Sequence, residues 1–290
     1  MRKAWEIRTA SPGDRAYPPL LAQIKKPPPV LYYIGDLEEA CRGPCLAVVG
    51  ARKGTAYGRW AAGRIAERAA ACGVTIVSGM AYGVDAAAHQ GALRAPGGKT
   101  VAVLGCGVDI PYPEAHRELM GRIAAAGAVI SELPPGTEPR KSYFPARNRI
   151  ISGISKGVLV AEAGLRSGSL ITAGTAAEQG RDIFAVPGNI NNVYSLGANK
   201  LIQDGAVPIV VIDDILDCLG IPRPLDRAAE EALGKDEALV YRAVAGGSER
   251  SVEEIARETG KSPAEIGALV TILEMKGWVQ TAVGKIFVAK

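Results

Sequence analysis

The sequence predicts an α/β protein: an extended Rossmann-like, doubly wound and mostly parallel sheet, followed by a small C-terminal winged-helix domain. From Cys45 onward, apolar runs rich in β-branched residues alternate with Ala-rich segments of helical pattern. Strands that are buried on both faces of a parallel sheet have this near-continuous apolar character. Residues 236–290 instead show a helix–turn–helix pattern followed by a hairpin, which is typical of a winged helix.

Composition bounds the class of protein. The 290 residues are 48% hydrophobic and can bury a sizeable core, while the net charge of +4 means that polyanion binding needs local clustering of cations. The N-terminus lacks the apolar core of a signal peptide, and no apolar run is long enough to span a bilayer. Five cysteines without a CxxC pair indicate reduced thiols. We expect a cytoplasmic protein without membrane association, metal or cofactor.

Four segments differ in pattern. Residues 1–43 are Pro-rich and are expected to form an N-terminal extension that packs on the core and ends in a short strand, Val30–Ile34. Residues 44–220 form the Rossmann-like domain. Residues 221–235 are rich in proline and charge and read as a linker, and residues 236–290 form the winged-helix domain.

Seven strands follow in order within the Rossmann-like domain, and each is a short apolar run bounded by turn residues. They are predicted at Leu46–Gly50, Val74–Ser78, Thr100–Leu104, Ala128–Ser131, Gly157–Ala161, Asp182–Val186 and Val207–Val211. Helical periodicity predicts the intervening helices near 56–72, 83–94, 114–126, 145–155, 168–180 and 195–204.

The winged-helix domain has its own signals. Helices are predicted at Glu237–Val244, Ser251–Glu258 and Ala264–Lys276, and a hairpin at Val279–Val288. Ser251 with Glu254 matches a capping box. The domain carries seven Lys and Arg against eight Asp and Glu, so contact with protein is favoured over independent DNA binding.

Ligands of parallel sheets bind beyond the carboxyl ends of the strands, so the polar loops there should share one rim. These loops are Gly50–Gly58, Ser78–Asp85, Gly105–Pro113, Glu162–Ser169 and Pro187–Asn192. We therefore expect one site assembled from all five loops.

The first loop favours anion binding. Gly50, Arg52 and Lys53 lie beside a helix start whose amide groups are expected to be free. The glycine spacing matches neither the dinucleotide fingerprint nor a P-loop. The alternative is a glycine turn that only lets the helix pack on the sheet.

Residues 144–189 hold the strongest binding signal. Arg147 and Asn148 stand near Phe144, and an aromatic ring beside arginines supplies base stacking together with phosphate contact. Ser167, Gly168 and Ser169 form a small-residue turn into a helix, where phosphates bind readily. Lys156 and Lys200 extend the basic track. The alternatives for Arg147 and Arg149 are a solvated helix face or a structural ion pair with Glu162 or Glu178.

Residues suited to bond-breaking chemistry are few. Asp85 and His89 share one helix face, but a helix-capping Asp85 and a buried, hydrogen-bonded His89 are favoured over acid–base work. Asp109 suits a loop-stabilising role as well as contact with a ligand hydroxyl. Without a partnered nucleophile, a hydrolytic triad is improbable.

The ordered blocks GARKGTAYG, SGMAYGVDAAAH, GCGVDIPYP, SELPPG, FPARNRIISGIS, EAGLRSGSLITA, GRDIFAVPGN and SLGANKLIQDGA resemble the DNA-processing protein A family (DprA/Smf) over roughly residues 17–219. The resemblance implies a non-enzymatic homodimer that binds incoming single-stranded DNA and loads the RecA recombinase in natural transformation. It places the family's DNA pocket on Arg52, Ser78, Gly79, Phe144, Arg147, Asn148, Ser167, Gly168, Ser169, Asn189 and Lys200.

Three functions are therefore weighed. The first is the recombination mediator, whose candidate single-strand site consists of these residues together with Gly50 and Lys156. The second is a Rossmann-type nucleotide hydrolase with Glu162 as its catalytic residue, against which the absence of a PGGxGT-type motif counts. The third is a ligand-sensing transcription regulator, which rests on the winged helix alone. The family's N-terminal sterile-alpha-motif-like domain is expected to be absent.

Overall fold

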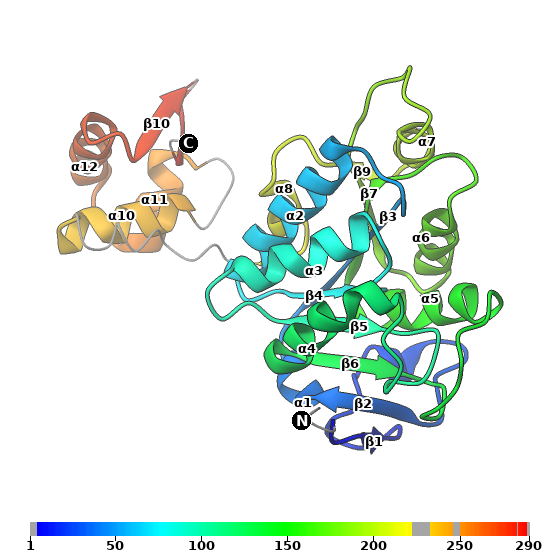
Figure 1. Ribbon diagram of the computed structural model, residues 1–290. Helices are drawn as coiled ribbons and strands as arrows, with labels where there is room; N and C mark the ends of the chain where they lie inside the picture. The colour runs from blue at the N-terminus through cyan, green and yellow to red at the C-terminus, as the bar shows by residue number, and fades with distance from the viewer. Residues whose placement is uncertain (1–4, 222–232, 246–249, 283, 289–290) are drawn as a thin grey trace. The chain divides into compact units, whose positions relative to one another are not determined.

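The computed structural model describes residues 5–221, 233–245, 250–282 and 284–288, and it divides into two compact units, Met1–Ile215 and Leu216–Lys290. Figure 1 shows the elements of each unit. The expected linker, 221–235, lies for the most part outside the described residues.

The first unit is built on a nine-stranded sheet with the order β1-β2-β6-β5-β4-β3-β7-β8-β9. Only β1 and β2 run antiparallel to their neighbours, so the sheet is mostly parallel, as predicted. Its strands are β1 (Arg8–Ala10), β2 (Leu31–Gly35), β3 (Cys45–Gly50), β4 (Thr75–Ser78), β5 (Thr100–Val103), β6 (Ala128–Ser131), β7 (Gly157–Glu162), β8 (Asp182–Ala185) and β9 (Val207–Pro208).

The strand order reverses between β3 and β7. From β3 the chain winds through β4 and β5 to β6, then returns to place β7 on the other side of β3. The loops that follow β3 and β7 therefore diverge at the carboxyl edge of the sheet, which is the topological switch point where doubly wound sheets bind ligands. The sheet thus provides one preferred position for a site.

Helices cover both faces of the sheet (Figure 1), because the strands are apolar on each side. α2, α3 and α4 cover one face, and α5 and α6 the other. The helical elements of this unit are η1 (Leu21–Gln23), α1 (Leu37–Ala40), α2 (Ala56–Ala71), α3 (Val84–Arg94), η2 (Glu114–His116), α4 (Arg117–Ala126), α5 (Tyr143–Ile154), α6 (Gly168–Glu178) and α7 (Leu196–Gln203), and α8 (Asp214–Cys218) spans the boundary between the two units.

The last predicted strand is shorter than expected. The apolar run from Val207 to Val211 forms a strand only at Val207–Pro208. Proline has no N–H to donate to a sheet, and the amides of Val210 and Val211 instead donate to the Asp214 carboxylate at 2.7 and 2.8 Å. β9 therefore ends after Pro208, because the following amides bind the Asp214 carboxylate and do not continue the strand.

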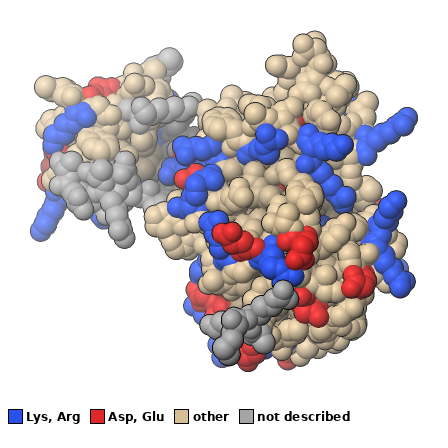
Figure 2. Space-filling view, viewed as in Figure 1, with Lys and Arg blue, Asp and Glu red and all other residues tan. Residues whose placement is uncertain are grey.

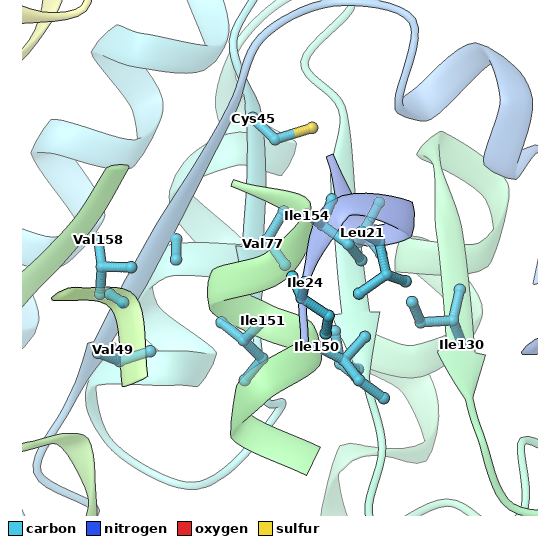
Figure 3. Packing of buried hydrophobic residues seen from close by; sticks show 14 of the residues in the cluster. Leu21, Ile24, Cys45, Val49, Val77, Ile130, Ile150, Ile151, Ile154 and Val158 are labelled. Carbon is cyan, nitrogen blue, oxygen red and sulfur yellow. The ribbon is translucent and has the colours of Figure 1, made fainter. Parts of the chain in front are cut away.

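The Pro-rich N-terminal segment packs against the core. Leu21 and Ile24 lie against Ile150 and Ile154 of α5 (Figure 3), and all four side chains are buried. Gly153 permits the approach, since a Cβ there would lie 2.8 Å from a Leu21 methyl group. α5 is thus held between this segment and the sheet, which fixes the helix that carries Phe144 and Arg147.

From residue 233 onward, the described part of the second unit shows three helices and a hairpin, the winged-helix pattern that the sequence predicts. They are α10 (Lys235–Ala245), α11 (Val252–Thr259), α12 (Pro263–Met275), β10 (Val279–Ala282) and β11 (Lys285–Val288). Capping boxes start α11 at Ser251 and α12 at Ser262. None of the helices described in either unit has the length and apolarity needed to cross a bilayer.

Candidate nucleic-acid interface

A cleft of about 680 Å³ opens at the switch point of the sheet. Its walls come from the loop after β3, the loop after β7, the start of α5 and the start of α6. Eight of the predicted site residues line this cleft: Gly50, Arg52, Phe144, Arg147, Asn148, Ser167, Gly168 and Ser169. Segments that are distant in the sequence therefore meet at one site.

The amide groups at the start of α2 are not all free, contrary to expectation. The Thr55 amide and hydroxyl donate to the two carboxylate oxygens of Glu162, at 2.6 and 2.7 Å. The position of Gly58 leaves no room for a side chain, because a Cβ there would lie 2.4 Å from the Glu162 carboxylate. An internal carboxylate therefore occupies the place where a Rossmann protein often binds phosphate.

Phe144 forms an aromatic and cationic wall. Its ring stacks with Tyr112 at a centroid distance of 5.4 Å, and the Arg52 guanidinium lies 5.4 Å from the ring centroid. Gly105 makes room for the ring, since a Cβ there would lie 2.9 Å from it. A planar base and a phosphate could both bind here, because the wall offers a ring face and a positive charge together.

Arg147 is buried beneath the cleft, only 6% exposed. Its guanidinium donates to the Gly79 carbonyl at 3.0 Å and to the Val103 carbonyl, so it joins the carboxyl ends of β4 and β5. Burial lowers the pKa of Arg147 to about 10. Burial also raises the pKa of Asp85, an effect that the nearby Arg147 charge opposes.

The start of α6 offers the open anion site. Ser167 caps the helix, and its hydroxyl lies 2.7 Å from that of Ser169. The Asn148 side chain donates to the Gly168 carbonyl at 3.4 Å, which links α5 to this turn. The first turn of α6 carries no acidic residue, and a Cβ at Gly168 would meet nothing within 4 Å. The positive end of the helix dipole therefore faces the cleft without an internal counter-charge.

The remaining predicted residues lie outside the cleft lining. Ser78 is buried below it, where its hydroxyl donates to the Val48 carbonyl at 2.6 Å. The Gly79 carbonyl accepts a hydrogen bond from the Arg147 guanidinium. Lys156 precedes β7 and so lies at the opposite edge of the sheet. Asn189 is exposed in the loop after β8. Lys200 pairs with Asp204 on α7 at 2.8 Å.

Further cations and aromatic residues line the cleft: Lys53, which the sequence pattern already favoured for anion binding, and Lys141, Arg166, Tyr112 and Tyr194, which it did not single out. Lys53, Lys141 and Arg166 are exposed there, and no carboxylate of the described residues lies within ion-pair distance of them. Tyr112 and Tyr194 add rings. Lys141 lies three residues before Phe144, and Arg166 directly precedes Ser167. This nearness in the sequence could have identified both cations as site residues. In Figure 2, Lys and Arg side chains stand along the side of the first unit where α5, α6 and α7 lie.

The ion-pair alternative for Arg149 names the wrong partner, since its guanidinium pairs with Glu132, in the loop after β6. Asp85 does not cap α3 as expected. The N-cap is Gly83, and Asp85 lies in the first turn and accepts from the Ala81 amide at 3.4 Å. Asp109 stabilises its loop by accepting from the Gly136 amide.

His89 is fully buried, and its Nδ1 lies 2.7 Å from the Thr100 hydroxyl. Burial first, and then the Arg147 charge, lowers its pKa to about 3. In the unfolded chain His89 gains a proton as the pH falls below about 6.5, whereas in the folded protein it stays neutral until about pH 3. Protonation therefore favours the unfolded chain, and the stability that neutral His89 contributes above pH 6.5 is lost as the pH falls towards 3.

We therefore expect His89→Asn to weaken the acid sensitivity of folding. From pH 7 to pH 5 the wild-type chain should lose about 2 kcal/mol more unfolding free energy than the variant. Urea unfolding of both proteins at the two pH values measures the difference. The titration of Asp85, which has the opposite effect on stability, is present in both proteins and therefore cancels in this difference. Equal losses would show that His89 is protonated in the folded protein.

The fold and the cleft together define a class: a Rossmann-like protein without the dinucleotide fingerprint, with a cationic and aromatic cleft at its switch point, and with a winged-helix unit after it. The family model described as DNA recombination-mediator protein A matches residues 8–220, and the DprA winged helix domain matches residues 223–285. The chain belongs to the DNA recombination-mediator protein A family.

Relatives are found across bacteria. The chain is 44% identical over 227 residues to the Synechocystis protein Smf, covering 77% of this chain and 56% of that one. It is 40% identical to a putative DNA processing protein DprA of Mycobacterium tuberculosis, covering 82% and 63%. The chain thus spans between half and two thirds of the length of these relatives.

Two solved structures are similar. The X-ray structure of DprA from Streptococcus pneumoniae matches with a TM-score of 0.69 and 44% identity, covering 73% of this chain and 74% of that one. DNA processing protein A of Helicobacter pylori, described for its single-stranded DNA binding mode, matches with a TM-score of 0.67 and 31% identity, covering 74% and 96%.

Proposed function

We propose that this protein binds single-stranded DNA without cutting it, and that it protects incoming strands and loads the RecA recombinase on them during natural transformation. The observation that carries the proposal is the cleft wall in which the Arg52 guanidinium lies over the Phe144 ring, opposite the open start of α6. This arrangement suits a polymer of stacked bases and phosphates better than one mononucleotide.

Charge supports a strand as the ligand. Arg52, Lys53, Lys141 and Arg166 line the cleft, and no ion pair joins any of them to a carboxylate of the described chain. Each of these cations can contact a phosphate and release a counter-ion. The Helicobacter pylori relative is described as binding single-stranded DNA, which favours the same ligand here.

The partner proteins are proposed on other grounds. Recombinase loading in the cytoplasm rests on the family, whose model is described as a recombination mediator. A homodimer is supported by apolar side chains that the first unit exposes in and just after β9, including Val207, 39% exposed, and Val210, 80% exposed. The α12 helix carries Glu265 and Glu274 but no Lys or Arg, so we assign the winged-helix unit to protein contact.

We expect the chain to bind oligothymidylate tightly at low salt and much more weakly at high salt. If the four cleft cations each contact one phosphate, log Kd should change with log salt with a slope of about 3. Fluorescence anisotropy of a labelled oligonucleotide across a salt series measures this, and a duplex of equal length is the control. Absence of single-strand binding at low salt would overturn the proposal.

The same samples distinguish a binding protein from a nucleotide hydrolase. The catalytic candidate of that alternative, Glu162, is 2% exposed and accepts two hydrogen bonds from Thr55. We therefore expect the oligonucleotide to be recovered intact, and nucleoside monophosphates to release no base. Release of base that is lost in Glu162→Gln would favour the hydrolase.

A further inference from the structure

α2 carries two aromatic side chains, Tyr57 and Trp60, that lie on the surface and are not part of the hydrophobic core. Tyr57 is 48% exposed and Trp60 is 58% exposed. Their ring centroids are 6.2 Å apart and their planes lie within 25° of each other, so the two rings form a stack on the outside of the helix. Large aromatic side chains bury much of their surface in most proteins, and an exposed stacked pair needs an explanation.

The pair follows one wall of the cleft in the sequence. Arg52 and Lys53 line the cleft and come just before α2, Tyr57 lies in the first turn of the helix, and Trp60 lies about one turn further on. In Figure 1 the start of α2 lies beside β7, whose following loop forms the facing wall. A strand that runs from the cleft past Arg52 and Lys53 along α2 would reach these rings.

The stack is held in a fixed position. The Tyr57 hydroxyl donates to the Pro187 carbonyl at 3.1 Å, which ties the ring to the loop after β8. Thr55 anchors the first turn through Glu162, and the Arg59 guanidinium donates to the Gly54 carbonyl. A ring that is already ordered loses little conformational entropy when a ligand stacks on it.

Charge around the stack favours a polyanion. The first turn of α2 carries no acidic residue, Arg59 is exposed on the same stretch, and the cleft end is cationic through Arg52 and Lys53. Glu67 is the one acidic residue of α2, and it already pairs with Arg64 and Arg94. Aromatic faces beside unneutralised cations are the combination that single-stranded nucleic acids use.

We propose that Tyr57 and Trp60 form a second base-stacking platform, outside the cleft, for the same single strand that the cleft binds. The platform takes a base of the segment that emerges past Arg52 and Lys53, and so lengthens the footprint of the protein on the strand. The proposal rests on the proposed function of the cleft, but it assigns a separate site on a different element.

The platform predicts an effect that depends on strand length. A short oligothymidylate of about four nucleotides should occupy only the cleft, whereas one of about sixteen should reach α2. We expect Trp60→Ala to weaken binding of the long strand about tenfold and to leave binding of the short strand unchanged, while Trp60→Phe should keep most of the affinity for the long strand. Met275→Ala, an exposed apolar residue of the other unit, is the matched control.

Tryptophan fluorescence reports the contact itself. The chain has three tryptophans, Trp5, Trp60 and Trp278. The long strand should quench the emission of the wild-type chain, the short strand should quench it much less, and Trp60→Phe should remove the difference between them.

The outcomes separate the two proposals. If the short strand does not bind the wild-type chain, the cleft proposal fails and the platform fails with it. If the short strand binds but Trp60→Ala leaves both the affinity for the long strand and the quenching unchanged, only the platform is overturned. A change of oligomeric state in Trp60→Ala with unchanged DNA binding would likewise overturn it and assign the pair to contact between copies.

Discussion

Arg147→Ala should lower the unfolding free energy of the first unit by about 3 kcal/mol and abolish single-strand binding with it. The buried guanidinium donates to the carbonyls of Gly79 and Val103, which follow β4 and end β5. Without it these buried carbonyls lose a donor, and buried Asp85 loses the positive charge that stabilises its ionised form. Urea unfolding followed by circular dichroism measures the loss.

Arg166→Ala is the matched control for this experiment. Arg166 also lines the cleft, but it is exposed, and no ion pair joins it to the described residues. Its removal should change stability by less than about 0.5 kcal/mol while reducing the salt dependence of strand binding. If Arg147→Ala unfolds like the wild-type chain yet fails to bind DNA, then Arg147 contacts phosphate directly and does not act by holding the floor of the cleft.

Phe144→Ala should weaken single-strand binding by about 1 to 3 kcal/mol, or roughly fivefold to 150-fold, with little loss of stability. The ring is partly exposed and stacks on Tyr112, while Arg52 lies against it. Its removal deletes the stacking face and also frees the Arg52 side chain, which then loses conformational entropy when it meets a phosphate. Anisotropy titrations at fixed salt measure the change.

Phe144→Tyr should retain most of the affinity because it keeps the stacking face. Tyr82→Ala is a second control, since Tyr82 is also exposed but contacts His116 instead of the Phe144 cluster. Equal losses for Phe144→Ala and Tyr82→Ala would show that general surface change, and not stacking on Phe144, weakens binding.

Much of the architecture could be predicted because it depends on local patterns. The six central strands lie within one residue of their predicted bounds at each end, since apolar β-branched runs between turn residues define them. The shortening of β9 and the division of 114–126 into η2 and α4 could not be predicted, because they depend on an Asp214 side chain and on a local change of hydrogen-bond pattern.

Site residues were predictable where backbone chemistry decides their role. Ser167, Gly168 and Ser169 form a helix start that the small-residue pattern signals. The positions of Ser78 and Lys156 outside the cleft lining could not be predicted, because they depend on burial and on the end of the strand at which each residue lies. The sequence also shows that Glu162 ends a strand, but not that its carboxylate accepts from Thr55, since that contact joins two halves of the sheet.

The bond between Thr55 and Glu162 makes the cleft a product of long-range folding. The two residues are 107 positions apart, and their strands become neighbours only after the chain has passed through β4, β5 and β6 and returned. Such long-range contacts require a long loop to close before they stabilise the fold. A fragment that ends before β7 would contain β3 to β6 but only one wall of the cleft, because the loop after β7 and the start of α6 form the other. The cleft therefore requires both halves of the sheet.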